Sequence, residues 1–486
     1  METDGLGVGL VYWPGLEPLL EAGGPSLTSL EIEVEAFWLA DPDPRSPPRL
    51  DPRAVQRIAA LPQAKVIHGI GGPVGGSRGP SLAHLDRIAA SVRAFDARWY
   101  SEHLAFNGGV ADGKPVAAGF LLPPLQDKAG ARAAARTIRL VQGYLGQRIA
   151  VETGVNYLKP RAWELQDGAF VALVQELADC DLLLDLHNIW TNARNGRQPV
   201  ADFLAQIDLS RVREIHLAGG IEYRGYWLDA HSGPVPSPVL DLAREVVPRL
   251  PALGAIHVEV LPQFIPYLDL EALGEQLREI SAIWDTRGSR VAPPAIGARA
   301  GDPSRSAHPR AAAPCAPQAF EDCLASLVAG LPVALNSPWA LDLAQDPGIA
   351  LLTDLARTFR AGVVVDHLKM SSRYLILHDG QDAFRGLLND FWRSQCPMPL
   401  AMAEARAFAH WLRGRSISAP HLHSLLDYDL AMLGAGEADG PQPIRFDCEP
   451  LGLLRALGEG RLPEHLKPGA FELELTDTQA RHALRT

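Results

Sequence analysis

The sequence predicts an α/β fold: a (β/α)8 barrel of the TIM type over residues 1–285, followed by a smaller, mainly α-helical C-terminal domain. At 486 residues the chain exceeds what one hydrophobic core usually supports. Through residues 1–285, eight short runs of β-branched and aliphatic residues alternate with longer segments of helical periodicity. Residues 286–317 are rich in Ala, Pro, Gly, Ser and Arg and have no apolar period, which predicts a linker before a domain at 318–486.

The predicted barrel elements follow one another in strict alternation. The strands are Gly7–Leu10, Leu30–Val34, Ala64–His68, Arg98–Ser101, Arg148–Glu152, Leu182–Leu186, Glu214–Leu217 and Ala255–Val260. The helices are Arg53–Leu61, Leu82–Phe95, Ala129–Leu145, Gly168–Leu177, Pro199–Gln206, Val239–Val247 and Leu270–Trp284. A doubly wound sheet is the competing topology. The barrel is favoured because GIGGPVGG at 69–76 contains no GxGxxG that runs directly into a helix.

The C-terminal region carries helical periodicity and no group of residues of catalytic type. The predicted helices are Phe320–Leu331, Gly348–Phe359, Asp382–Ser394 and Met402–Leu412, and the predicted strands are Tyr374–His378 and Gln442–Asp447.

Composition narrows the class of protein. The chain is 47% hydrophobic and 21% charged, with a net charge of -12, which is typical of a globular protein and argues against a nucleic-acid partner. No apolar run approaches the roughly 20 residues that span a bilayer. The N-terminus has Glu2 and Asp4 but no basic segment, and the five cysteines form no CxxC pair. We therefore expect a cytoplasmic protein with neither a membrane partner nor a disulfide framework.

Side chains that can bind metal stand at the ends of six consecutive predicted strands. They are His68, His103, Glu152, then Asp185, His187 and Asn188, then His216 with Asp229 and His231 in the following loop, and finally Glu259. In a barrel these strand ends face one mouth. A single histidine or carboxylate there is usually a packed or ion-paired residue, but burying so many together is costly unless a cation compensates them. Imidazole and carboxylate ligands without thiolate suit iron, manganese or zinc, and four carboxylates suit two or three divalent ions.

Two pairs of aromatic residues near the mouth are predicted to contact a substrate. Tyr12 and Trp13 follow the first strand, and Tyr226 and Trp227 lie in a loop flexed by glycine. Ser101, Glu102 and His103 do not form a hydrolase triad, because neighbours on one strand cannot converge.

Seven short motifs together resemble the multinuclear non-haem iron-dependent oxidases, a family that includes the methanobactin-biosynthesis oxidase. They are HG at 68–69, SEHLAF at 101–106, VE at 151–152, LLLDLHN at 182–188, IHLAG at 215–219, DAH at 229–231 and VE at 258–259. The resemblance implies a barrel with two or three irons (Fe2+/Fe3+). Nine of the ten residues named above match its ligand positions, and His187 stands where the family often has Asn or Ser. Thr153, Asn195-Gly196 and Gly220 also depart from the family pattern.

The resemblance further implies an oxidase that uses O2 to modify a residue, commonly a cysteine, of a ribosomally synthesised precursor peptide. The C-terminal domain resembles the partner proteins that recognise the leader of such a peptide. Two alternatives stay open at this point. One is a redox-neutral metal-dependent barrel enzyme, such as an isomerase or a phosphodiesterase. The other is a catalytically silent metal-binding barrel that serves as a peptide-binding platform.

Overall fold

Eight parallel strands close into a barrel, as predicted. The structure is a computed structural model that describes residues 5–22, 27–39, 48–289, 314–395, 401–434 and 442–475. In chain order the strands are β1 (Gly7–Val11), β2 (Leu27–Glu33), β5 (Ala64–Gly69), β6 (Tyr100–His103), β9 (Ala150–Glu152), β10 (Asp181–Asp185), β11 (Val212–Ala218) and β14 (Ala255–Glu259). Strand β1 pairs with both β2 and β14, which closes the barrel.

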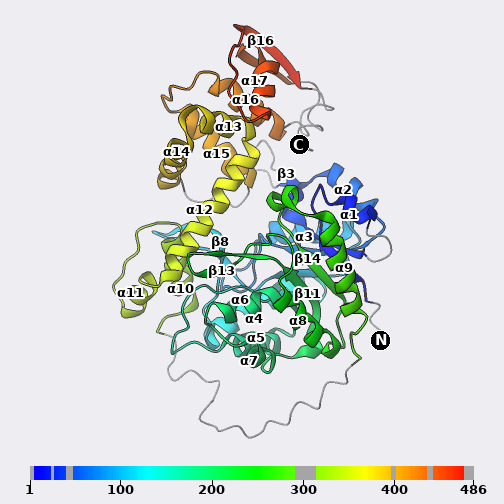
Figure 1. The fold of residues 1–486 in the computed structure, drawn as a ribbon. Coiled ribbons are helices and arrows are strands. Elements are labelled where there is room, and N and C mark those ends of the chain that lie inside the picture. The colour runs from blue at the N-terminus through cyan, green and yellow to red at the C-terminus, as the bar shows by residue number, and fades with distance from the viewer. Residues whose placement is uncertain are drawn as a thin grey trace.

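Helices surround the barrel on its outside (Figure 1). They are α1 (Glu17–Ala22), α2 (Pro52–Ala59), α3 (Leu82–Ala94), α4 (Lys128–Leu145), α5 (Asp167–Ala178), α6 (Leu186–Arg194), α7 (Val200–Leu204), α8 (Ser237–Val246) and α9 (Leu270–Trp284). Helix α4 shows why they form. Asp127 caps its first turn by accepting the Gly130 N–H, and Gly146 ends it at a φ of 68°. Its buried residues, such as Ala134, Ile138 and Val141, recur every three or four positions and join the main core.

Two hairpins and one further short strand pair, which were not predicted, interrupt this alternation. One follows β6 and consists of β7 (Phe106–Ala111) and β8 (Lys114–Leu122). A second follows β11 and consists of β12 (Gly220–Tyr223) and β13 (Tyr226–Asp229), while the short β3 (Trp38–Leu39) pairs with β4 (Arg49–Leu50). Because β6 and β11 end at the barrel mouth, the two hairpins rise from that mouth.

The C-terminal region is mainly helical, as predicted. It contains α10 (Pro317–Val328), α11 (Pro338–Ala344), α12 (Pro347–His367), α13 (Lys369–Asp379), α14 (Gln381–Ser394), α15 (Ala401–Arg413), α16 (Leu422–Gly434), α17 (Pro450–Gly458) and the antiparallel strands β15 (Gln442–Cys448) and β16 (Pro468–Leu475). The strand predicted at Tyr374–His378 is wrong, because these residues lie inside α13. A short apolar run does not distinguish strand from helix by periodicity, and no Gly or Pro breaks this one before Gly380.

Helix α12 joins two apolar clusters. Its first half, with α10, packs on the β7–β8 hairpin in a cluster that includes Leu352, Leu324 and Phe106. Its second half, at Val364, belongs to a separate cluster built from α13–α17 and the β15–β16 pair. The two groups of helices are seen below and above the middle of α12 in Figure 1. The domain boundaries predicted from the sequence stay a prediction, and residues 290–313 of the predicted linker lie outside the described residues. None of the described helices is long and apolar enough to cross a membrane.

Candidate metal centre

The register of the barrel strands brings the predicted residues together. Across neighbouring strands His103 pairs with Glu152, and Asp185 pairs with His216. All of these lie at the carboxyl ends of their strands, where side chains that point inward meet at one mouth. Asp185 and His216 are fully buried, and Glu152 is 3% exposed.

Glu152 lies at the centre of the group. Its Oε2 is 3.1 Å from Nε2 of His68 and 3.0 Å from Nε2 of His103. Its Oε1 is 3.7 Å from Nδ1 of His216, which is itself 3.3 Å from Oε2 of Glu259. Glu152 thus belongs to two clusters of possible ligand atoms, one with His68 and His103 and one with Asp185, His216 and Glu259. A carboxylate with one oxygen toward each cluster has the arrangement of a bridge between two neighbouring ions.

Buried polar atoms without hydrogen-bond partners test whether these residues fit a metal. Six such atoms belong to the predicted ligands, and none has a hydrogen-bond partner among the described residues, although four of them face one another at ion-pair distance. They are His68 Nε2, Glu152 Oε2, Asp185 Oδ2, Asn188 Oδ1, His216 Nδ1 and Glu259 Oε2. Buried polar atoms are nearly always hydrogen-bonded, so six atoms without a hydrogen bond around one mouth, four of them crowded against each other, favour a shared ion as the missing partner. Each is an oxygen or an imidazole nitrogen, and a borderline divalent ion accepts both. The residues therefore fit a metal.

The electrostatics of the mouth point the same way. Burial raises the pKa of Asp185 well above its ordinary value, and Asp229 and Glu259 raise it further. Burial alone would lower the pKa of His103, but Glu152 and Glu102 raise it to about 10. The metal-free mouth therefore holds protons among crowded acids and imidazoles, and divalent ions would replace those protons.

Asp229 and His231 lie beside these two clusters. Nε2 of His231 is 3.1 Å from the Asp229 carboxylate and 3.4 Å from Oε2 of Glu259. Asn188 contributes its unpartnered Oδ1, and its Nδ2 lies 3.5 Å from Oε1 of Glu152.

His187, which the sequence placed among the ligands, differs from the others. Its Nδ1 is 2.9 Å from Oδ1 of Asp229, and its Nε2 accepts a hydrogen bond of 3.0 Å from the Trp227 indole N–H. Both ring nitrogens are therefore engaged, which argues against direct ligation by His187.

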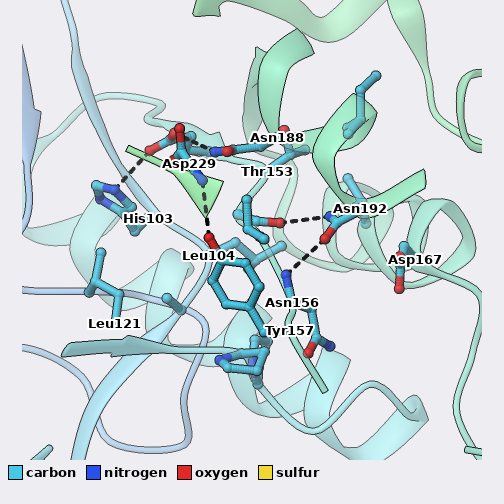
Figure 2. A pocket seen from close by; sticks show the side chains of 18 of the residues that line it. His103, Leu104, Leu121, Thr153, Asn156, Tyr157, Asp167, Asn188, Asn192 and Asp229 are labelled. Carbon is cyan, nitrogen blue, oxygen red and sulfur yellow. Dashed lines mark hydrogen bonds and ion pairs between the residues drawn. The ribbon is translucent and has the colours of Figure 1, made fainter. Parts of the chain in front are cut away.

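A cavity of about 130 Å³ opens beside the candidate ligands. Five of them line it: His103, Glu152, Asn188, Asp229 and His231. Figure 2 shows Asn156 and Asn192 on one side of it, hydrogen-bonded to each other, and the Tyr157 hydroxyl against the backbone of Asp229. Apolar residues such as Leu121 and Phe170 supply the walls. An engineered cavity of about 150 Å³ holds one benzene, so this cavity suits a single side chain.

The four aromatic residues predicted to contact substrate do not line this cavity. Tyr12 is fully buried and donates a hydrogen bond of 2.9 Å to Glu17, which argues against substrate contact. Trp13 packs near Phe37, with 6.3 Å between ring centroids. Tyr226 packs edge-on against Tyr157. The indole N–H of Trp227 donates a hydrogen bond to His187.

A buried polar layer beneath the mouth was not predicted. Oε2 of Glu31 is 2.8 Å from Nε2 of His216, so the other nitrogen of that ring faces Glu152 and Glu259. Below it, Nδ1 of His257 is 2.6 Å from Oε1 of Glu214. The interior of such a barrel is normally aliphatic. The signal in the sequence was strand alternation, because Glu214 and His257 stand two residues before His216 and Glu259 and so point the same way.

The fold and site together define a class: a (β/α)8 barrel whose mouth carries a candidate multinuclear metal centre. Residues 23–283 match the family described as RiPP precursor modification enzyme MbnB/TglH/ChrH, RiPP denoting a ribosomally synthesised and post-translationally modified peptide. The match covers more than half of the chain, and the chain belongs to this family.

Several relatives share the barrel region. A UPF0276 protein of Streptomyces avermitilis is 30% identical over 208 residues, which cover 42% of this chain and 43% of that relative. A UPF0276 protein of Neisseria meningitidis serogroup C is 33% identical over 211 residues, which cover 42% of this chain and 72% of the relative. The chain thus spans less than half the length of the first of these relatives.

Solved structures with a similar fold include a xylose isomerase domain containing protein from Salmonella typhimurium, with 12% identity and a TM-score of 0.37, covering 58% of this chain and 98% of the other. A D-allulose 3-epimerase from Methylomonas has 14% identity and a TM-score of 0.37, covering 57% of this chain and 96% of the other. Likenesses at this level carry no argument about activity.

Proposed function

We propose that this protein is a multinuclear non-haem iron, O2-dependent oxidase that modifies a cysteine of a ribosomally synthesised precursor peptide. The observation that carries the proposal is the set of six buried ligand-type atoms at the barrel mouth that lack hydrogen bonds and fall into two clusters of possible metal ligands. Membership of a family of precursor-modifying enzymes supports a peptide as the substrate. Every candidate ligand atom is a nitrogen or an oxygen, which supports iron; manganese and zinc accept the same donors.

The two clusters divide the candidate ligands. His68 and His103 would hold one ion, and Asp185, His216 and Glu259 would hold a second. Glu152 belongs to both groups and would contribute a carboxylate oxygen to each. Asn188, Asp229 and His231 would complete the coordination at the side that faces the cavity. Iron bound there would supply one-electron chemistry with dioxygen.

The residues around the candidate ligands orient those ligands or line the cavity in which substrate would bind. Glu31 holds the His216 ring so that Nδ1 faces the mouth. Asn156 and Asn192 are hydrogen-bonded to each other, and Asn156 also donates to Gln126, so these amides already have protein partners. A small side chain such as that of cysteine fits a cavity of about 130 Å³ with mainly apolar walls and reaches His103 and Glu152 from it.

The test combines metal analysis with oxygen uptake. Protein produced under iron-replete, anaerobic conditions should contain one to three irons per chain. It should also consume oxygen when a short cysteine-containing peptide, chosen from the reading frames beside its gene, is added. Stoichiometric zinc or manganese without oxygen uptake would instead favour a redox-neutral barrel enzyme.

Filling the cavity separates substrate binding from metal binding. Gly154 lines the cavity at an exposed position, and a Cβ built there meets no atom within 4 Å, so Gly154→Leu adds an apolar side chain at the cavity mouth without a backbone clash. This variant should keep its iron and lose peptide-dependent oxygen uptake by at least about tenfold, the effect of roughly 1.4 kcal/mol. Gly143→Leu is the matched control, because a Cβ in that position of α4 also meets nothing within 4 Å. Equal uptake by both variants would show that substrate does not enter this cavity.

A further inference from the structure

Three residues at the barrel mouth form a hydrogen-bonded chain that ends on a candidate ligand. His187, in the first turn of α6, is fully buried. Its Nε2 accepts from the Trp227 indole N–H at 3.0 Å, and its Nδ1 is 2.9 Å from Oδ1 of Asp229. An indole N–H only donates, so Nε2 is the acceptor and the proton of the neutral ring is on Nδ1. Nδ1 therefore donates to Asp229, and neither nitrogen has a lone pair left for an ion.

Trp227, which donates the first hydrogen bond of this chain, is held through both its backbone and its ring. The Asn195 side chain accepts from the Trp227 backbone N–H at 2.9 Å and donates to the Trp227 carbonyl at 2.9 Å. The Trp227 ring packs edge-on against Trp190, with 5.5 Å between centroids, and the Arg194 guanidinium lies 4.3 Å from its centroid. Helix α6 and the residue that follows it thus fix strand β13 two residues before Asp229.

Asp229 is fixed from a second direction. Its backbone N–H donates to the Tyr157 hydroxyl at 3.1 Å, and the neighbouring Leu228 is buried in the cluster that α10 and α12 share with the barrel. With one carboxylate oxygen held by His187, Oδ2 lies 3.1 Å from Nε2 of His231 at the metal mouth. The backbone and one oxygen are therefore positioned independently of any ion.

We propose that His187 is a positioning residue: Trp227 sets the tautomer of His187, and His187 aims the Asp229 carboxylate at the metal centre without binding an ion itself. This inference rests on the proposed metal site. It assigns Trp227, placed by the sequence among the substrate contacts, a part in building the site.

Titration of Mn2+ into the metal-free full-length protein tests the proposal without any turnover. The number of ions at saturation and their affinity are measured for the wild type, Trp227→Phe, His187→Ala and His187→Gln. Trp227→Phe should leave the number of ions unchanged and weaken the affinity about tenfold or more, the usual effect of losing a group that orients a ligand. His187→Ala should weaken it by about 10- to 100-fold at unchanged stoichiometry. His187→Gln should recover part of this loss, because its amide N–H can donate to Asp229.

Trp190→Phe is the matched control, because it alters an aromatic ring that packs against Trp227 and His187 but removes none of the hydrogen bonds of the chain. It should leave the affinity near that of the wild type. Loss of one ion at saturation in both His187 variants, together with an unchanged affinity in Trp227→Phe, would show that His187 is a ligand and would overturn the inference. If the wild type binds no Mn2+, Fe2+ or Zn2+ at all, the proposed metal site fails and the inference fails with it.

Discussion

Raising the pH should strengthen metal binding, because His103 must lose a proton before it can bind an ion. Burial alone would lower the pKa of His103, but Glu152 and Glu102 raise it to about 10 in the metal-free protein. Burial would likewise lower the pKa values of His216 and His231, and neighbouring carboxylates raise both well above the ordinary value. At neutral pH these imidazoles therefore carry protons that an ion must displace.

The size of the pH effect on metal affinity follows from the coupling between proton release and ion binding. Each displaced proton changes the apparent affinity by about tenfold, or 1.4 kcal/mol, per pH unit below the pKa of the group. His103 alone should therefore strengthen binding by about 100-fold between pH 7 and pH 9. Stability of the metal-free protein should change in the opposite direction. The pKa of His103 is raised, so its contribution is fully present below the unfolded value of about 6.5 and is lost as the pH rises toward 10.

The assay is calorimetric titration of Mn2+ at pH 7, 8 and 9, repeated in two buffers with different protonation enthalpies so that released protons are counted. Glu102→Gln should flatten the pH dependence, because Glu102 helps to raise the pKa of His103 and is not among the candidate ligands. An affinity that stays constant from pH 7 to pH 9, with no proton released, would refute this reasoning.

Three further predictions concern the fold and the ligands. Leu324→Ala, at the buried centre of the contact between α10 and the barrel, should lower the free energy of unfolding by about 2–5 kcal/mol in denaturant melts. Leu341→Ala on the exposed face of α11 should change it by less than about 0.5 kcal/mol. Elemental analysis of Glu152→Ala and His216→Ala should show that metal is lost, while the far-ultraviolet circular dichroism spectrum stays unchanged. A full metal content in either variant would remove that residue from the ligand set. A chain ending at Asp285 should aggregate on size-exclusion chromatography, because it uncovers the apolar face of the β7–β8 hairpin under α10. A monodisperse product would show that this cover is dispensable.

The eight barrel strands were predictable because each is a short β-branched or aliphatic run between helical segments. The predicted Ala255–Val260, for example, differs from β14 by one residue. The hairpins after β6 and β11 were missed, although each carries a local signal. Asp112-Gly113 and Arg224-Gly225 both have positive φ at the two central residues, as two-residue hairpin turns require, and Asp-Gly is the characteristic sequence of such a turn. The second of these segments was interpreted as a loop flexed by glycine, and the first was given no element.

The residues of the candidate site that stand at strand ends could be predicted from the sequence. The register of parallel strands brings His103 and Glu152 together without further information. The role of His187 was not predictable, because it depends on which neighbours occupy its two nitrogens, and one of them, Trp227, comes from an unpredicted hairpin. Tyr12 follows a strand end as the ligands do, but its ring turns toward Phe37 and is buried there.

Helix α12 connects the helices that pack on the β7–β8 hairpin with the C-terminal helices. Its 21 residues, at about 1.5 Å each, make a rod of roughly 31 Å that is anchored in one apolar cluster at each half. An extended peptide that reached along this rod would need about nine or ten residues at roughly 3.3 Å each. If the C-terminal helices recognise the precursor, as the sequence predicts, the number of residues between the recognised segment and the modified residue would have a lower limit. Shortening that spacer in the peptide should reduce modification even if both segments bind normally.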